Sequence, residues 1–150
     1  MKKLLLSLSF YYLFISCSPD CPLPMGEYQG TAILTNDSLC DTFNIILEIT
    51  SEEYQKGIGI SDPLGNSITP FYLNGNLSIE SICDLPLERL NSYTGEKDDG
   101  TIVVNFMAHD SDEKNPVLIS GEGSYVKGKI EGNFGFLPST YENGEFELFH

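Results

Sequence analysis

The sequence predicts an all-β domain, an antiparallel up-and-down meander that closes into a barrel, and three observations lead to this class. Apolar residues recur with a period of two, which is the pattern of half-buried antiparallel strands. Turn residues separate these segments at short intervals, and no segment has a convincing helical period. The composition, with 14 Gly, 8 Tyr, 9 Phe and no Trp, also favours short strands and tight turns over a helical bundle.

The clearest strand lies around residues 43–50, where alternate residues are apolar and expected to face inward. Two further inward sets occur at 102–108 and 130–136, and the three sets are Phe43, Ile45, Leu47 and Ile49; Ile102, Val104, Phe106 and Ala108; and Ile130, Gly132, Phe134 and Phe136. Weaker strands are predicted at 27–35, 54–61, 67–73, 76–82, 86–93, 117–125 and 144–149.

Turn residues define the connections. Asn74 and Gly75 form a strong two-residue hairpin pattern between two apolar runs. About nine or ten short strands with local connections indicate a meander, and a meander of this size removes its edges most easily by closing into a barrel. A two-sheet β-sandwich is the alternative.

The N-terminus has the features of an export signal. Lys2 and Lys3 precede an uncharged run from Leu4 to Ile15, which is shorter than the roughly 20 residues that a membrane-spanning helix needs. The following residues, Ser16 and Cys17, end a stretch that resembles the lipobox of bacterial lipoproteins. The resemblance implies a signal peptide over 1–16 that is cleaved, and acylation of Cys17. The alternative is an ordinary secretory signal cleaved nearby, with Cys17 left as a thiol or disulfide partner.

The remaining chain reads as one domain on a short tether. Residues 17–25 include Pro19, Pro22 and Pro24 and have no periodicity, so they are expected to hold the domain about 25 Å or less from the lipid. Residues 26–150 suit a single β domain. The formal charge of −14 excludes nucleic-acid binding and attachment to anionic lipids by a basic face, so membrane contact is expected through the lipid anchor.

A family resemblance follows from both ends of this domain. Gly26-Glu27-Tyr28-Gln29-Gly30-Thr31 opens the first strand, and Gly128-Lys129-Ile130-Glu131-Gly132-Asn133-Phe134 comes late in the series. This arrangement resembles the small lipocalin-like (calycin-like) domains of Gram-negative envelope lipoproteins. The resemblance implies a cell-envelope protein with its domain in the periplasm or on the cell surface. Ser18, directly after Cys17, resembles the sorting pattern of lipoproteins sent to the outer membrane. Tyr28 stands where the larger family has Trp, and no family site residue transfers.

Catalytic chemistry is poorly represented, and neither an enzyme nor a resident cofactor is expected. His109 and His150 are the two histidines, and neither has a Ser or Cys nearby that would make a nucleophile and base pair.

One loop carries a possible calcium site. Asp110, Asp112 and Glu113 could offer oxygens to Ca²⁺, with a plain polar loop as the alternative. Because alternate connections of a meander fall at the same end, loops 36–42, 62–66, 83–86, 109–116 and 138–143 are predicted to share a rim. That rim would gather acidic residues, namely Asp37, Asp41, Asp62, Asp84, Asp110, Asp112 and Glu113.

The same rule, that alternate connections fall at the same end of the barrel, predicts a disulfide between Cys40 and Cys83. Export places the chain in an oxidising compartment, and both cysteines fall at one rim, while Cys21 lies at the opposite end. Cys21 then stays a free thiol or pairs between molecules. If Cys17 is not acylated, Cys17 pairs with Cys21 beside the Cys40–Cys83 bond.

Two functions remain open. The first is a module whose barrel mouth binds a small apolar or amphipathic ligand. The second is an accessory or structural lipoprotein with a filled core, which docks on another envelope protein. An eight-stranded barrel allows either interior. Bulky inward residues favour the filled core slightly: Phe43, Phe71, Phe106, Phe134 and Phe136.

Overall fold

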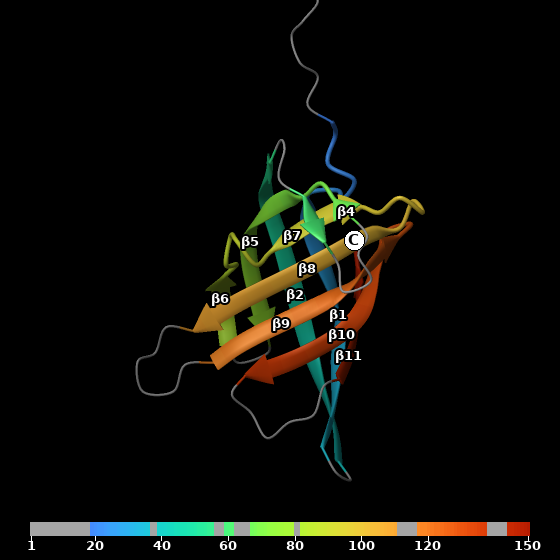
Figure 1. Ribbon diagram of the computed structural model, residues 1–150. Helices are drawn as coiled ribbons and strands as arrows, with labels where there is room; N and C mark the ends of the chain where they lie inside the picture. The colour runs from blue at the N-terminus through green and yellow to red at the C-terminus, as the bar shows by residue number, and fades with distance from the viewer. Residues whose placement is uncertain are drawn as a thin grey trace, which may run out of the picture.

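The computed structural model describes residues 19–36, 39–55, 59–61, 67–79, 82–110, 117–137 and 144–150, and it confirms the all-β class (Figure 1). The strands are, in chain order, β1 (Gly26–Asn36), β2 (Leu39–Tyr54), β3 (Ile60–Ser61), β4 (Ser67–Ile68), β5 (Phe71–Ile79), β6 (Ile82–Pro86), β7 (Tyr93–Glu96), β8 (Ile102–Asp110), β9 (Val117–Val126), β10 (Lys129–Leu137) and β11 (Gly144–Phe149). Within these described ranges, no helix is long and apolar enough to span a bilayer.

The main sheet closes on itself into an antiparallel barrel. Its order is β2-β1-β11-β10-β9-β8-β7-β5-β6, and β2 pairs with β5 as well as with β1. β6 and β7 follow one another along the same edge of β5, so together they fill one position of the eight-stranded barrel. Because both edges of the sheet are joined, the two-sheet sandwich is excluded.

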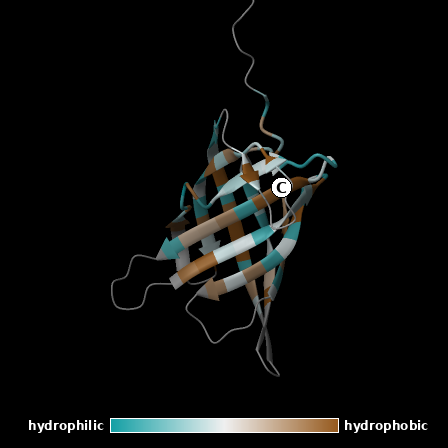
Figure 2. Cartoon of the chain, in the orientation of Figure 1, coloured by the Kyte–Doolittle hydropathy of each residue, from teal (hydrophilic) through white to brown (hydrophobic). Residues whose placement is uncertain are grey.

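Side chains alternate between the interior and the outer surface, as predicted. In β11, Gly144, Phe146 and Leu148 are buried while the residues between them are exposed. Figure 2 shows the same alternation as brown and teal bands along several strands. The three predicted inward sets are confirmed by their most buried members, which are at most 2% exposed: Ile45, Leu47, Ile49, Val104, Phe106, Ala108, Ile130 and Phe134.

Asn74 and Gly75 lie in the middle of β5, so the hairpin predicted at this position is wrong. Gly75 pairs with Ile49, beside the point where the β2–β5 register shifts. A Cβ atom on Gly75 would lie 1.8 Å from the carbonyl oxygen of Glu48. The glycine therefore allows two strands to approach each other closely at a bulge. An Asn-Gly pair suits such a position as well as it suits a turn.

The predicted strands at 54–61 and 67–73 are not two separate strands of the barrel. Tyr54 at the end of β2 pairs directly with Phe71 at the start of β5, so one connection joins these strands at one end. Within that connection, β3 and β4 pair only with each other, and we call them the β3–β4 arm. Loop 62–66 itself falls outside the described residues, so its predicted grouping with loop 36–42 stays a prediction.

The two ends of the barrel are named here by the chain segments that lie there. The tether end holds the start of β1, the β9–β10 turn and His150; the far end holds the β1–β2 turn. At the tether end the segment predicted as a free tether packs on the barrel (Figure 1). Leu23 is 2% exposed and belongs to the core, and Cys21 packs against the same cluster. The folded domain therefore includes residues before Gly26.

Candidate functional site

The barrel interior, where a ligand-binding barrel would hold its ligand, is lined by one continuous apolar cluster. Three phenylalanines meet at its centre, each at most 1% exposed. The Phe106 and Phe146 rings pack edge to face at 5.4 Å, and the Phe134 and Phe146 rings do so at 6.3 Å. These are favourable separations for aromatic pairs. These three rings therefore pack against one another within the described part of the interior.

Polar groups inside the barrel are engaged by the backbone. Ser92 and Thr94 are the buried polar residues among those described, and both are fully buried. The Thr94 hydroxyl donates to the carbonyl oxygen of Val103 at 2.7 Å. The Ser92 hydroxyl donates to the Met107 carbonyl oxygen at 3.2 Å and accepts from the Met107 N–H at 3.0 Å. These hydroxyls tie residues 92–94 to the backbone of β8, and their donor hydrogens are already used there.

The N-terminal segment covers the tether end through specific contacts. The buried Tyr28 hydroxyl donates to the carbonyl oxygen of Pro24 at 2.7 Å. The Tyr28 ring lies 4.8 Å from the His150 ring, and Nε2 of His150 lies 3.2 Å from the Met25 carbonyl oxygen. We call Cys21 to Pro24, with Tyr28 beneath them, the cap. It joins the beginning of β1 to the residue after β11.

Burial in the cap disfavours the charged form of both ionisable groups. Desolvation raises the pKa of the Tyr28 hydroxyl above its ordinary value of 10.0. Desolvation is also the main reason that the pKa of the Cys21 thiol lies above 9.0, with the nearby charge of Glu52 acting in the same direction. A hydrogen bond with the Leu23 backbone partly offsets this rise. The Cys21 thiol is therefore a poor nucleophile at neutral pH.

A groove of about 230 Å³ lies on the outer surface, between the β3–β4 arm and strands β7 to β9. Ile68 on the arm is 2% exposed and packs over Gly95, where a Cβ atom would lie 2.3 Å from its Cγ2 atom. This contact holds the arm against the barrel. Both apolar and polar side chains line the groove: Ser61, Ile68, Tyr93, Lys97, Val103, Asn105 and Glu122.

A second hollow, of about 240 Å³, lies over β10 and β11 and is acidic. Glu131, Glu145 and Glu147 line it. Lys129 Nζ lies 2.6 Å from Glu131 Oε2 and 2.8 Å from Glu147 Oε1. Hydrogen bonds to these carboxylates raise the pKa of Lys129. The hollow is thus partly neutralised by the chain's own lysine, and the described residues contain no group of three His, Cys, Asp or Glu that could hold a metal ion.

The predicted calcium residues lie at the edge of the described chain. Asp110 ends β8 and pairs with Val117, while Asp112 and Glu113 fall outside the described residues. The calcium site stays a prediction. Of the predicted acidic rim, Asp84 lies within strand β6, so 83–86 is not the loop that the sequence suggested. Asp37 and Asp62 fall outside the described residues.

The cysteine predictions also remain open. Cys17 lies outside the described residues. Cys40 pairs with Thr35 in the β1–β2 ladder, and Cys83 lies in β6. The β1–β2 and β5–β6 connections both follow strands that run from the tether end, so both lie toward the far end of the barrel. The structure does not describe the two side chains, so the bond stays a prediction. Cys21 is a free, half-buried thiol.

The cap and the outer groove were not anticipated from the sequence. Prolines on both sides of Leu23 suggested an extended tether, and the one apolar residue between them was the available sign of packing. The groove depends on the arm folding back over Gly95, which no local pattern encodes.

Comparison with protein-family models gave no match, and neither curated proteins nor solved structures include a significant relative of this chain. Function must therefore be argued from the barrel itself.

Proposed function

We propose that the chain is a lipid-anchored envelope protein that works through the outer surface of its barrel, as an accessory protein that docks on another envelope protein. The packed aromatic centre supports this proposal most. Phe106, Phe134 and Phe146 pack against one another inside the barrel, and an eight-stranded barrel has an interior just wide enough to be filled by its own side chains. The fold is compatible with a lipocalin-like barrel. The function proposed here differs from that of a carrier with an open interior.

The outer groove is the place where a partner would bind. It combines an apolar base of Ile68 and Val103 with the aromatic ring of Tyr93 and with one cation and one anion, Lys97 and Glu122. Protein interfaces concentrate their binding energy at aromatic residues in such desolvated recesses, surrounded by polar groups. A side chain or short loop of a partner fits its volume better than a whole lipid does.

Ligand titration tests the interior. Purified protein is mixed with N-phenyl-1-naphthylamine, an apolar fluorescent probe, and a native mass spectrum is recorded. We expect no saturable complex. The Phe106→Ala variant is the positive control, because an apolar cavity of this kind takes up small aromatic molecules. Its fold is checked by circular dichroism. Stoichiometric binding by the unchanged protein would favour the alternative, a barrel that carries a small apolar or amphipathic ligand.

Cross-linking in cells tests the docking. A photoreactive phenylalanine analogue at Tyr93 is expected to give one discrete cross-linked product, while the same analogue at Ile33, on the wall across the barrel, gives none. Equal products from both positions would contradict docking at the groove.

Fractionation tests the anchor. Cys17→Ala is expected to release the protein into the soluble fraction. Retention of this variant in salt-washed membranes would contradict attachment through Cys17.

A further inference from the structure

We propose that the tether end rests directly on the bilayer surface, through an apolar strip formed by Met25, Val126 and Phe149. The proposal rests on the lipid anchor at Cys17 assigned above, and it adds how the barrel is oriented on the membrane. The barrel is expected to stand on its tether end, with the far end pointing away from the lipid.

The first argument is the length of chain between the lipid and the barrel. Cys21 already packs on the core, and Cys17 precedes it by four residues. Even a fully extended chain covers at most about 3.6 Å per residue, so the Cα atoms of Cys17 and Cys21 are at most about 14 Å apart. Headgroups on the two sides together account for the roughly 10–15 Å by which a bilayer exceeds its hydrocarbon core, so the layer on one leaflet is about 5–8 Å thick and the fully extended tether exceeds it by less than about 10 Å. The tether end is therefore held at the lipid surface.

The second argument is where the exposed apolar side chains gather. Met25 is 52% exposed, Val126 is 58% exposed and Phe149 is 53% exposed. Lys129 pairs across the sheet with both Val126 and Phe149. The His150 side chain reaches the Met25 carbonyl oxygen, and the His150 N–H donates to the Gly128 carbonyl oxygen at 2.8 Å. These contacts place the three apolar side chains around one end of β9 to β11.

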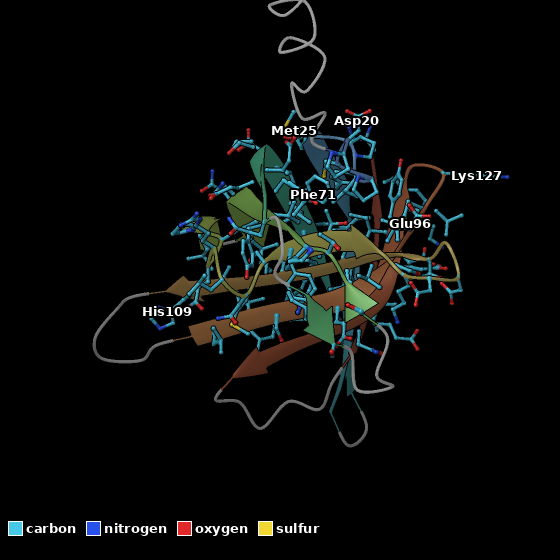
Figure 3. All side chains as sticks on the ribbon, turned by 45° about the horizontal axis from the view of Figure 1, so that its top comes forward. Asp20, Met25, Phe71, Glu96, His109 and Lys127 are labelled. Carbon is cyan, nitrogen blue, oxygen red and sulfur yellow. The ribbon has the colours of Figure 1, made fainter. Side chains whose placement is uncertain are left out.

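Two lysines accompany the strip. Lys127 stands at the tip of the β9–β10 turn with a φ of 50°, and Figure 3 shows its side chain extending away from the barrel. Lys129 Nζ lies 5.8 Å from the centre of the Phe149 ring. Lys127 suits the boundary between headgroups and acyl chains, because its stem can lie on apolar surface while its ammonium stays among phosphates. The Lys129 ammonium is already paired with Glu131 and Glu147.

Acidic residues at the same end decide which side makes contact. Asp98 and Asp99 lie in the β7–β8 turn, and Asp20 lies near Met25 in Figure 3. Anionic headgroups repel these carboxylates. On the β9–β11 side, the carboxylates of Glu131 and Glu147 are paired with Lys129, so contact is expected on that side, with the β7–β8 turn tilted away from the surface.

The absence of Trp from the sequence makes the test direct, because one substitution gives a single-Trp protein. Four lipidated variants are placed in phosphatidylethanolamine and phosphatidylglycerol vesicles whose acyl chains carry bromine near the headgroups. Val126→Trp and Phe149→Trp report on the strip. Ile33→Trp and Leu90→Trp are matched controls, since Ile33 is 45% and Leu90 is 72% exposed and neither lies at the tether end.

We expect bromine to quench Trp emission in the two strip variants, with a shift to shorter wavelength, and to leave the two controls unchanged. Flotation of the vesicles is measured in parallel. Protein that fails to float would refute the anchor and this proposal together. Protein that floats with all four Trp residues equally unquenched, or with the controls quenched more than the strip, would refute the orientation alone and leave the anchor standing.

Discussion

The two ends of the barrel are closed by different means. At the tether end, Leu23 and Tyr28 are almost fully buried, and the chain before β1 lies across the opening. At the far end, the last inward aromatic residues are Phe43 and Phe136, whose rings are 6.2 Å apart and which stay partly exposed. The tether end is therefore covered by a segment that is itself part of the core.

Replacing neighbouring phenylalanines of β10 should measure how packing falls off toward the far end. Phe134 is 1% exposed and Phe136 is half-buried, and their rings are 5.5 Å apart. We expect Phe134→Ala to lower the free energy of unfolding by about 3–5 kcal/mol, and Phe136→Ala to lower it by about half as much. Urea denaturation measures both. Equal losses would show that the far end is packed as tightly as the centre.

Leu23→Ala should show whether the cap belongs to the core. A buried leucine shortened to alanine loses about 2–5 kcal/mol, and we expect about 2–3 kcal/mol here because the cap lies at one end of the barrel. Met25→Ala, two residues later and 52% exposed, is the matched control and should change stability by less than about 0.5 kcal/mol. If both substitutions are neutral, the N-terminal segment is a tether after all.

Tyr28→Phe should loosen the cap without opening a cavity. The change removes the hydrogen bond to the Pro24 carbonyl oxygen, and we expect a loss of about 1 kcal/mol. Alkylation of Cys21 by N-ethylmaleimide should become faster at the same time, because the half-buried thiol belongs to the segment that this hydrogen bond holds. A loss of stability with an unchanged alkylation rate would mean that this hydrogen bond does not hold the segment down.

The smallest expected effect is a pH dependence confined to the tether end. The pKa of Cys21 is raised above 9.0 in the folded state, so folding favours the neutral thiol. Its contribution to stability is fully present below pH 9.0 and is lost as the pH rises through the folded pKa. Between pH 8 and pH 10, we expect Cys21→Ser to lose less stability than the unchanged protein in urea denaturation. If both proteins lose stability equally as the pH rises, the pH dependence does not come from the Cys21 thiol.

The sequence anticipated the strands better than their connections. Phe106, Phe134 and Ile45 were assigned inward from a period of two, because burial on one face of a strand imposes that period on the chain. Asn74 and Gly75 were assigned to a turn and lie in a strand, because a glycine needed for close strand approach resembles one needed for a positive φ. The predicted calcium and disulfide residues lie in or beside segments that the structure does not describe.

The sequence alone determined the all-β class, the inward residues of the main strands and the acidic surface, because alternation and charge are local properties of the chain. Only the tertiary structure decided that the sheet closes through β2 and β5, that Leu23 completes the core and that the arm packs over Gly95. Each of these is a contact between segments far apart in the chain. Such contacts depend on which surfaces fit together in space, and no periodicity of either segment records them.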